Sequence, residues 1–248
     1  MLAINSALGE ELVGHAVRSV EAAETFSDPF PHIFFRDFFP TDFYARLLEA
    51  FPPDDRFDRL KGDGTRLALR LYGDHVDRID NEQRALWSAV SAVLVSERLE
   101  AAVRAKLAEG LEIRRRGEKV ASVDDLRTIA KPVIYKDVDG YEIKPHPDTR
   151  KKVITMQLYC PADESQMDLG TTLYRASAKG LLNPGSYFLE PTKTLPFAPN
   201  VGYAFVVLKA YHTLTRMSWH GRPKITAPVE RPRMSILNTF YTDETLGF

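Results

Sequence analysis

Hydrophobic residues recur at helical spacing in the first half of the chain. Residues 41–51 carry an apolar stripe and are followed by two prolines, a pattern that predicts a short amphipathic helix. Residues 81–110 carry the longest stripe, and we expect one or two helices there that pack against a sheet. Residues 1–28 have a weaker stripe, between Leu12 and Val20, that also favours a helix.

Strand patterns dominate the second half of the chain. From Arg127 onward, short β-type runs are separated by Gly, Pro and Asp, and residues 137–140 have the composition of a hairpin turn. Two strands are also expected earlier, at residues 29–35 and 67–71. The later candidate strands are residues 128–136, 141–145, 152–159, 185–190 and 204–209, a run near His220, and residues 234–241.

This order of elements predicts an α+β fold with a mainly β core. We expect a double-stranded β-helix, the cupin-like jelly roll, with N-terminal helices packed on one sheet. The 248 residues are expected to form a single domain, 1–248, in which residues 1–126 are a largely helical support and residues 127–248 form the β core. A hydrophobic content of 44% is enough to bury a sizeable core.

The charges are nearly balanced and argue against a polyanionic partner. Lys and Arg number 33, Asp and Glu number 34, and the net charge is −1, so we expect no binding to nucleic acid. No apolar run approaches the roughly 18 residues of a membrane span, and the first residues lack the pattern of a signal peptide. With Cys160 as its one cysteine, the chain cannot form an internal disulfide. We expect a cytoplasmic protein without a membrane partner, and a homodimer is compatible with the sequence.

Residues 140–159 contain the first candidate metal ligands. They are expected to form a strand, a corner that carries His146 and Asp148, and a second strand. Residues i and i+2 of an extended chain point to the same side, so one imidazole and one carboxylate can reach a single ion. Two ligands do not complete a metal site. A third can come from residues 218–221, Ser-Trp-His-Gly, which precede an Arg-Met-Ser triplet at residues 233–235.

These three segments, in this order, resemble the signature of the Fe(II)- and 2-oxoglutarate-dependent oxygenases. The resemblance extends over roughly residues 30–241 and includes residues 161–174, which are similar to a segment of a bacterial subgroup. The His-x-Asp spacing alone is common by chance, whereas the ordered set is much more specific. The resemblance implies a jelly-roll enzyme that oxidises a substrate with O2 while it converts 2-oxoglutarate into succinate and CO2.

The resemblance also implies roles for individual residues. His146, Asp148 and His220 would be the catalytic ligands of Fe(II), in a two-histidine, one-carboxylate arrangement that leaves positions open. Arg233 would pair with the distal carboxylate of 2-oxoglutarate. Ser235 would add a hydroxyl donor from the same face of the strand.

The same resemblance suggests roles for two tyrosines and a third histidine, which lie outside the ordered set of motifs. Tyr135 and Tyr159 would place aromatic hydroxyls beside the cosubstrate. His212 is an alternative third metal ligand, but His220 is favoured because it precedes Arg233 by thirteen residues, which suits a strand, a turn and the next strand. Residues 209–217, which lead into the distal histidine, form a longer link than is usual in this family.

We therefore expect a hydroxylase that acts on an unactivated C–H bond of a small molecule, such as an amino acid or an intermediate in natural-product biosynthesis. In the halogenating branch of the superfamily that the chain resembles, the carboxylate position is a small residue, so Asp148 favours hydroxylation, while desaturation, epoxidation and ring closure stay open. Three alternatives are a prolyl-hydroxylase-like enzyme acting on a peptide or protein, a non-catalytic jelly-roll binding protein, and a cupin-type metal isomerase, which would not need Arg233.

Overall fold

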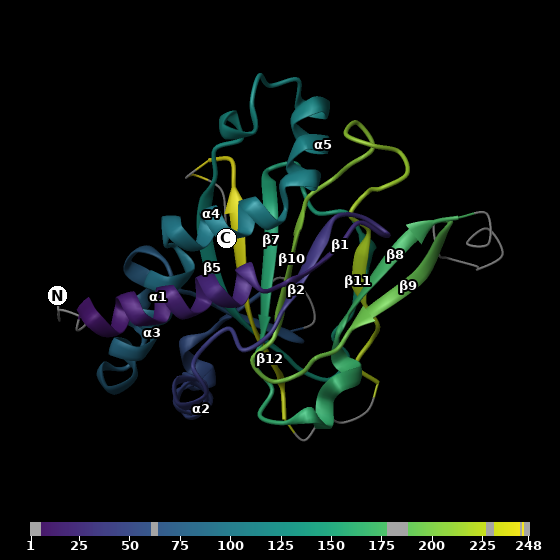
Figure 1. Ribbon diagram of the computed structural model, residues 1–248. Helices are drawn as coiled ribbons and strands as arrows, with labels where there is room; N and C mark the ends of the chain where they lie inside the picture. Colours follow the sequence, from purple (N-terminus) through teal and green to yellow (C-terminus); the bar gives the residue numbers. More distant parts are fainter. Residues whose placement is uncertain (1–5, 61–63, 178–187, 227–230, 244, 246–248) are drawn as a thin grey trace.

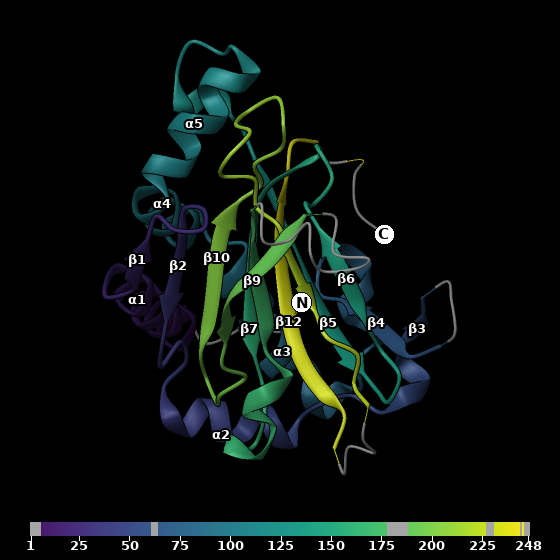
Figure 2. The same cartoon turned by 90° about the vertical axis from the view of Figure 1, so that its right-hand side faces the viewer.

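The strands form two antiparallel sheets that pack face to face (Figures 1 and 2). The computed structural model describes residues 6–60, 64–177, 188–226, 231–243 and 245. The large sheet has the strand order β1-β2-β10-β7-β12-β5-β4-β3, and the small sheet has the order β6-β11-β8-β9. From β5 onward the strands alternate between the two sheets, except that β8 and β9 both lie in the small sheet. This arrangement confirms the predicted jelly roll and its mainly β, α+β class.

The strand bounds show which predicted strands form. In the large sheet the strands are β1 (Glu24–Phe26), β2 (His32–Phe35), β3 (Asp58–Arg59), β4 (Arg66–Arg70), β5 (Ile129–Asp137), β7 (Lys152–Tyr159), β10 (Gly202–Val206) and β12 (Arg233–Tyr241). In the small sheet they are β6 (Ile143–His146), β8 (Thr171–Ala176), β9 (Leu189–Leu195) and β11 (His220–Arg222). The early strands expected at 29–35 and 67–71 are confirmed as β2 and β4. Of the strand expected at 185–190, residues 185–187 lie outside the described residues.

Helices cover the face of the large sheet that points away from the small sheet (Figure 1). They are α1 (Ser6–Glu21), α2 (Thr41–Glu49), α3 (Asn81–Leu94), α4 (Glu97–Lys106) and α5 (Ala108–Glu118). Short 3-10 turns occupy Asp54–Arg56, Gly73–Arg78, Val123–Asp125 and Glu164–Leu169. In the part of the chain that the structure describes, no helix combines the length and the apolar character needed to cross a bilayer.

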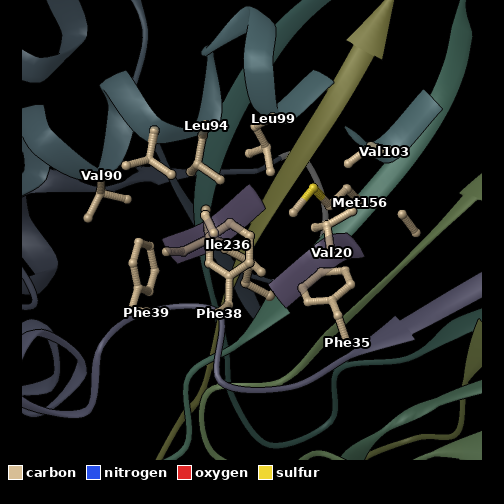
Figure 3. Close-up of a cluster of buried hydrophobic side chains, with 14 of the residues drawn as sticks. Val20, Phe35, Phe38, Phe39, Val90, Leu94, Leu99, Val103, Met156 and Ile236 are labelled. Atoms are coloured by element: carbon tan, nitrogen blue, oxygen red, sulfur yellow. The ribbon is translucent and has the colours of Figure 1, made fainter. Parts of the chain in front are cut away.

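The period-two pattern of the central strands separates a core from a cavity. On β7 and β12, Met156 and Ile236 point to the helices and join the main hydrophobic cluster, together with Leu94 and Leu99 (Figure 3). Alternate residues of the same strands, such as Ser235, point to the small sheet. Both faces are covered, which explains why seven of the eight β7 residues are buried.

Helix α5 carries three consecutive arginines, Arg114, Arg115 and Arg116, which differ in their exposure. The Arg114 side chain is buried, and its guanidinium donates to three backbone carbonyls, those of Lys152 at 2.7 Å, Val207 at 2.8 Å and Arg150 at 2.9 Å. A five-donor fork can satisfy several carbonyls at once, which offsets the cost of burying the charge. Arg114 thereby ties α5 to the beginning of β7 and the end of β10.

The helix-side core predicts a clear difference between two leucines. Leu99 on α4 is fully buried, whereas Leu214 is 77% exposed. Leu99→Ala should lower the free energy of unfolding by about 2–5 kcal/mol, because it removes buried methyl groups and leaves a cavity. Leu214→Ala, the matched control, should change it by less than about 0.5 kcal/mol. Urea unfolding measures both values, and equal losses would contradict this description of the core.

Candidate metal centre and adjoining cavity

Antiparallel pairing in the small sheet brings two histidines side by side. His146 ends β6 and His220 begins β11, and the two residues are direct cross-strand partners. Their rings lie 4.6 Å apart between centroids. Asp148 follows His146 by two residues, and its carboxylate lies 3.8 Å from Nε2 of each histidine.

His146, Asp148 and His220 together form a group that can hold a metal ion. Their ligand atoms all lie within 4.8 Å of one another, and among the described residues no other cluster of His, Cys, Asp and Glu meets this criterion. His220 and Asp148 are buried, and His146 is partly exposed. One carboxylate and two imidazoles are a donor set suited to iron and other divalent transition metals.

The backbone fixes which nitrogen of each histidine faces the ion. Nδ1 of His146 lies 3.0 Å from the carbonyl oxygen of Lys144, and Nδ1 of His220 lies 2.9 Å from that of Ser218. A carbonyl oxygen only accepts hydrogen bonds, so each Nδ1 must carry the proton. Both Nε2 lone pairs are therefore free to bind a metal, an orientation typical of metal-ligating histidines.

Asp148 is held by two donors from β7. Lys152 Nζ lies 2.8 Å from one carboxylate oxygen, and the Thr155 hydroxyl donates to the other at 2.6 Å. Burial by itself would raise the pKa of Asp148, but Lys152 and the two histidines outweigh it and hold the pKa well below its usual value. The carboxylate is therefore ionised at neutral pH.

His220 is neutral at the same pH. Burial lowers its pKa to about 4, against the attraction of the Asp148 carboxylate, which acts in the opposite direction. A neutral imidazole beside an ionised carboxylate is the protonation state that a divalent metal requires of its ligands. The protonation states, the tautomers and the donor set all fit a metal ion.

His212 lies outside this group. Its Nε2 is 3.1 Å from Glu118 Oε1, and its Nδ1 accepts a hydrogen bond from the backbone N–H of Lys209. Both ring nitrogens are thus engaged on the side of α5. His212 supports a loop next to the helix, while His220 lies beside His146.

A cavity of about 130 Å³ adjoins the three ligand residues. That volume is close to the roughly 150 Å³ of a cavity that holds benzene, so it suits a small organic acid. Polar and charged side chains from both sheets line it: Arg66, Tyr135, His146, Asp148, Lys152, Thr155, Gln157, Thr171, Tyr203, His220, Arg222 and Arg233. Ile143, Gly221 and Leu237 complete its wall.

Arg233 lies in the cavity wall and is fixed by several contacts. Its Nε donates to the carbonyl of Leu169 at 2.7 Å, and its Nη1 lies 3.2 Å from Asp137 Oδ2 and 3.3 Å from the Ser235 hydroxyl. The rings of Tyr159 and Phe197 contact the guanidinium at 5.1 and 4.5 Å from their centroids. Nη2 is buried without a hydrogen-bond partner, so one donor position stays available for a ligand.

The two tyrosines singled out from the sequence have different positions. Tyr135 lines the cavity and is the cross-strand partner of Ser235. Tyr159 is not among the lining residues, and its hydroxyl donates to Thr171 Oγ1 at 2.9 Å. Ser235 accepts a hydrogen bond from Gln157 Nε2 at 3.0 Å, which orients its hydroxyl beside Arg233.

Sequence reasoning missed the residues that surround Arg233. Arg66 on β4 and Arg233 on β12 both pair with Asp137 on β5, and Arg222 reaches the same carboxylate from the small sheet. The signal for Arg222 was its position two residues after His220, which places both on one side of β11. Arg66 and Asp137 offered no spacing signal, because only strand pairing brings them together.

Comparisons with known proteins agree with this architecture. The dioxygenase for auxin oxidation 1 from Arabidopsis thaliana, solved with 2-oxoglutarate, superposes with a TM-score of 0.53 over 98% of this chain and 90% of its own, at 12% identity. The chain adopts the 2-oxoglutarate oxygenase fold. Two further proteins were also matched. A prolyl-4-hydroxylase from Pseudomonas putida has 14% identity, coverage of 93% of this chain and 98% of its own, and a TM-score of 0.47. HygX from Streptomyces hygroscopicus, solved with nickel and 2-oxoglutarate, has 8% identity, coverage of 85% and 82%, and a TM-score of 0.48.

Sequence comparison alone does not find this oxygenase fold. No family model matches the chain, and no curated protein matches its sequence. At 12% identity a structural likeness concerns the fold, so the chemistry of the site has to be argued from this chain's own residues.

The geometry predicts which histidine binds metal. His220→Ala should weaken Zn(II) binding by more than the roughly 10- to 100-fold typical of losing a residue that orients a ligand, because it removes a ligand itself. His212→Ala should leave the affinity unchanged, since His212 bonds to Glu118 and Lys209. Competition with a fluorescent chelator measures both, and the reverse result would move the site to His212.

The hydroxyl of Thr155 offers a finer test. Thr155→Val keeps the shape of the side chain but removes the donor to Asp148, so metal affinity should fall about 10-fold. Thr239 on β12 is the cross-strand partner of Thr155, and Asp148 receives no hydrogen bond from it. Thr239→Val, the control, should leave the affinity within about twofold of the original. A Thr155→Val protein that binds metal normally would show that this hydrogen bond does not support the carboxylate.

Proposed function

We propose that this protein is a non-haem Fe(II)- and 2-oxoglutarate-dependent oxygenase that hydroxylates, or otherwise oxidises, a C–H bond of a small molecule. The observation that carries the proposal is the joint occurrence of the His146, Asp148 and His220 group and the anchored Arg233 around one cavity. A metal isomerase would need the first feature without the second. A cation fixed in the wall of the same cavity as the metal ligands supports a cosubstrate that has a carboxylate at its far end.

The proposed ligands of Fe(II) are His146, Asp148 and His220, and the iron would supply the redox chemistry that couples O2 to the substrate. In balance, 2-oxoglutarate, O2 and a C–H bond give succinate, CO2 and a C–OH group. A three-residue ligand set leaves the remaining coordination positions for small molecules. The hydrogen bonds from Lys152 and Thr155 keep Asp148 oriented and ionised throughout.

Arg233 is proposed to bind the distal carboxylate of 2-oxoglutarate. Its Nη2 is the free donor, and Ser235 lies beside it with a hydroxyl already oriented by Gln157. A buried, charge-assisted hydrogen bond is stronger than a neutral one. Tyr135 is retained as a neighbour of the cosubstrate, because it lines the cavity. Tyr159 is proposed to act indirectly, by packing against the Arg233 guanidinium.

Small size of the substrate is supported by the small volume of the cavity, about 130 Å³, because the cosubstrate would occupy most of it and leave room beside the metal ligands for only a small group. A reducing compartment such as the cytoplasm is part of the proposal, and it is supported by Cys160, whose thiol is buried and free.

Succinate formation tests the proposed function. Protein loaded anaerobically with Fe(II) and 2-oxoglutarate should release succinate when air is admitted, and more rapidly when a panel of small organic acids and amino acids contains the substrate. His220→Ala should abolish the signal. No succinate, together with no calorimetric binding of 2-oxoglutarate to the metal-loaded protein, would favour a non-catalytic binding protein.

The role of Arg233 predicts a loss of cosubstrate affinity. Arg233→Gln should raise the Kd for 2-oxoglutarate by about 10- to 100-fold, since a hydrogen bond to a charged group contributes about 1.5–3 kcal/mol. Calorimetry on Zn(II)-loaded protein measures this without turnover. Arg98→Gln, which removes an arginine that is 57% exposed on α4, is the matched control and should bind normally. An unchanged Kd in Arg233→Gln would exclude the proposed role.

A further inference from the structure

Positive charge exceeds negative charge around the cavity. Its lining includes four cations, Arg66, Lys152, Arg222 and Arg233. Lys152 pairs with Asp148, whereas the three arginines share the single carboxylate of Asp137. Among the described residues, two positive charges around this cavity are therefore left without a partner carboxylate. A surplus of buried charge is costly unless a ligand compensates for it.

The metal and the cosubstrate of the proposed function do not remove the surplus. A divalent metal adds two positive charges, and 2-oxoglutarate brings two negative charges. The site would therefore still hold two uncompensated positive charges with both bound. This balance favours a further anion in the same cavity.

Arg222 has the hydrogen-bonding capacity that such an anion needs. It is 3% exposed, and neither of its terminal nitrogens makes a hydrogen bond, although Nη2 lies 3.1 Å from Asp137 Oδ2. Arg66, by contrast, already donates to both oxygens of Asp137, at 2.6 and 3.0 Å. Of the two, Arg222 is the arginine with an open donor edge.

Its surroundings hold Arg222 in place. The Tyr141 ring lies 4.3 Å from the Arg222 guanidinium and 4.1 Å from that of Arg66. Arg222 also follows His220 by two residues on β11, so their side chains lie on the same side of the strand, about 7 Å apart along it. An anion bound at Arg222 would place the next few atoms of a short molecule near the metal ligands.

We propose that Arg222 binds an oxyanion of the substrate, a carboxylate or a phosphate, and that the substrate is a small organic acid. This inference rests on the proposed function and names its substrate class. Arg233 holds the cosubstrate, and Arg222 holds the substrate. These separate roles require that a substitution of Arg222 weakens binding of the substrate anion, and that a substitution of Arg233 weakens binding of 2-oxoglutarate.

Simple anions test the proposal on the whole protein. Zn(II)-loaded protein saturated with 2-oxoglutarate is titrated by calorimetry with acetate and, separately, with inorganic phosphate. At least one should bind saturably, and its Kd should rise about tenfold or more in Arg222→Gln. Arg98→Gln should bind as the original does. The stronger of the two anions indicates whether the substrate carries a carboxylate or a phosphate.

Two results of this titration would overturn the proposal. One is saturable binding of neither anion to the original protein. The other is undiminished binding to Arg222→Gln. Arg222→Lys keeps the charge but loses the planar fork, so its affinity should fall between those of the original and Arg222→Gln. Thermal unfolding of each variant shows that it is folded. No loss of stability is expected in Arg222→Gln, because Asp137 keeps Arg66 and Arg233 as partners.

Cosubstrate binding separates the proposal from its alternatives. Arg222→Gln should change the Kd for 2-oxoglutarate by less than about threefold, whereas Arg233→Gln should raise it at least tenfold. Equal losses would assign Arg222 to the cosubstrate and overturn the proposal. Absence of 2-oxoglutarate binding to the original Zn(II)-loaded protein would instead remove the proposed function, and the two failures are measured in separate titrations.

Discussion

Asp137 is a buried carboxylate that lies within ion-pair distance of three guanidinium groups, and the arrangement of the cavity depends on it. Strand pairing places Arg66 on one side and Arg233 on the other, and Arg222 approaches from the small sheet. Burial would raise the pKa of Asp137, but the three arginines, Arg66 foremost, lower it. One carboxylate orients three cations without neutralising them. The arginines are therefore positioned before any anion binds, and less ordering is needed when one does.

The metal ligands depend on both sheets. Pairing of β6 with β11 brings His146 next to His220 within the small sheet, whereas Asp148 is oriented by Lys152 and Thr155, which belong to the large sheet. The distances among the three metal ligands therefore depend on the separation of the two sheets. Arg114 contributes from the helix side, because it binds the carbonyls at the beginning of β7, close to Lys152. A displacement of α5 would therefore act on the beginning of β7, where Lys152 contacts the metal ligand Asp148.

The sequence was most informative where one strand carries two functional residues. His146 with Asp148, and Arg233 with Ser235, could be recognised because the period of an extended chain places positions i and i+2 on one face. The contacts of Asp137 with Arg66, Arg222 and Arg233 could not be predicted, since they depend on register between strands distant in sequence. The burial of Arg114 could not be predicted for a related reason. Its charge is satisfied by carbonyls 36 to 93 positions away, and no local pattern indicates them.

Buried arginines with open donors also determine how such a cavity selects its ligands. A neutral analogue of an organic acid would fit the same space, but it would leave guanidinium donors unpaired away from water, and that penalty falls on the analogue alone. A site built to hydrogen-bond its ligand rejects an analogue that cannot form those bonds, because the site's own polar groups are then left unpaired. This rejection is far stronger than discrimination by shape alone. With Arg222 on the small sheet and Arg233 on the large sheet, the proposed roles would make the cavity apply this selection twice, once to the cosubstrate and once to the substrate. Charge, more than volume, would then define which molecules react.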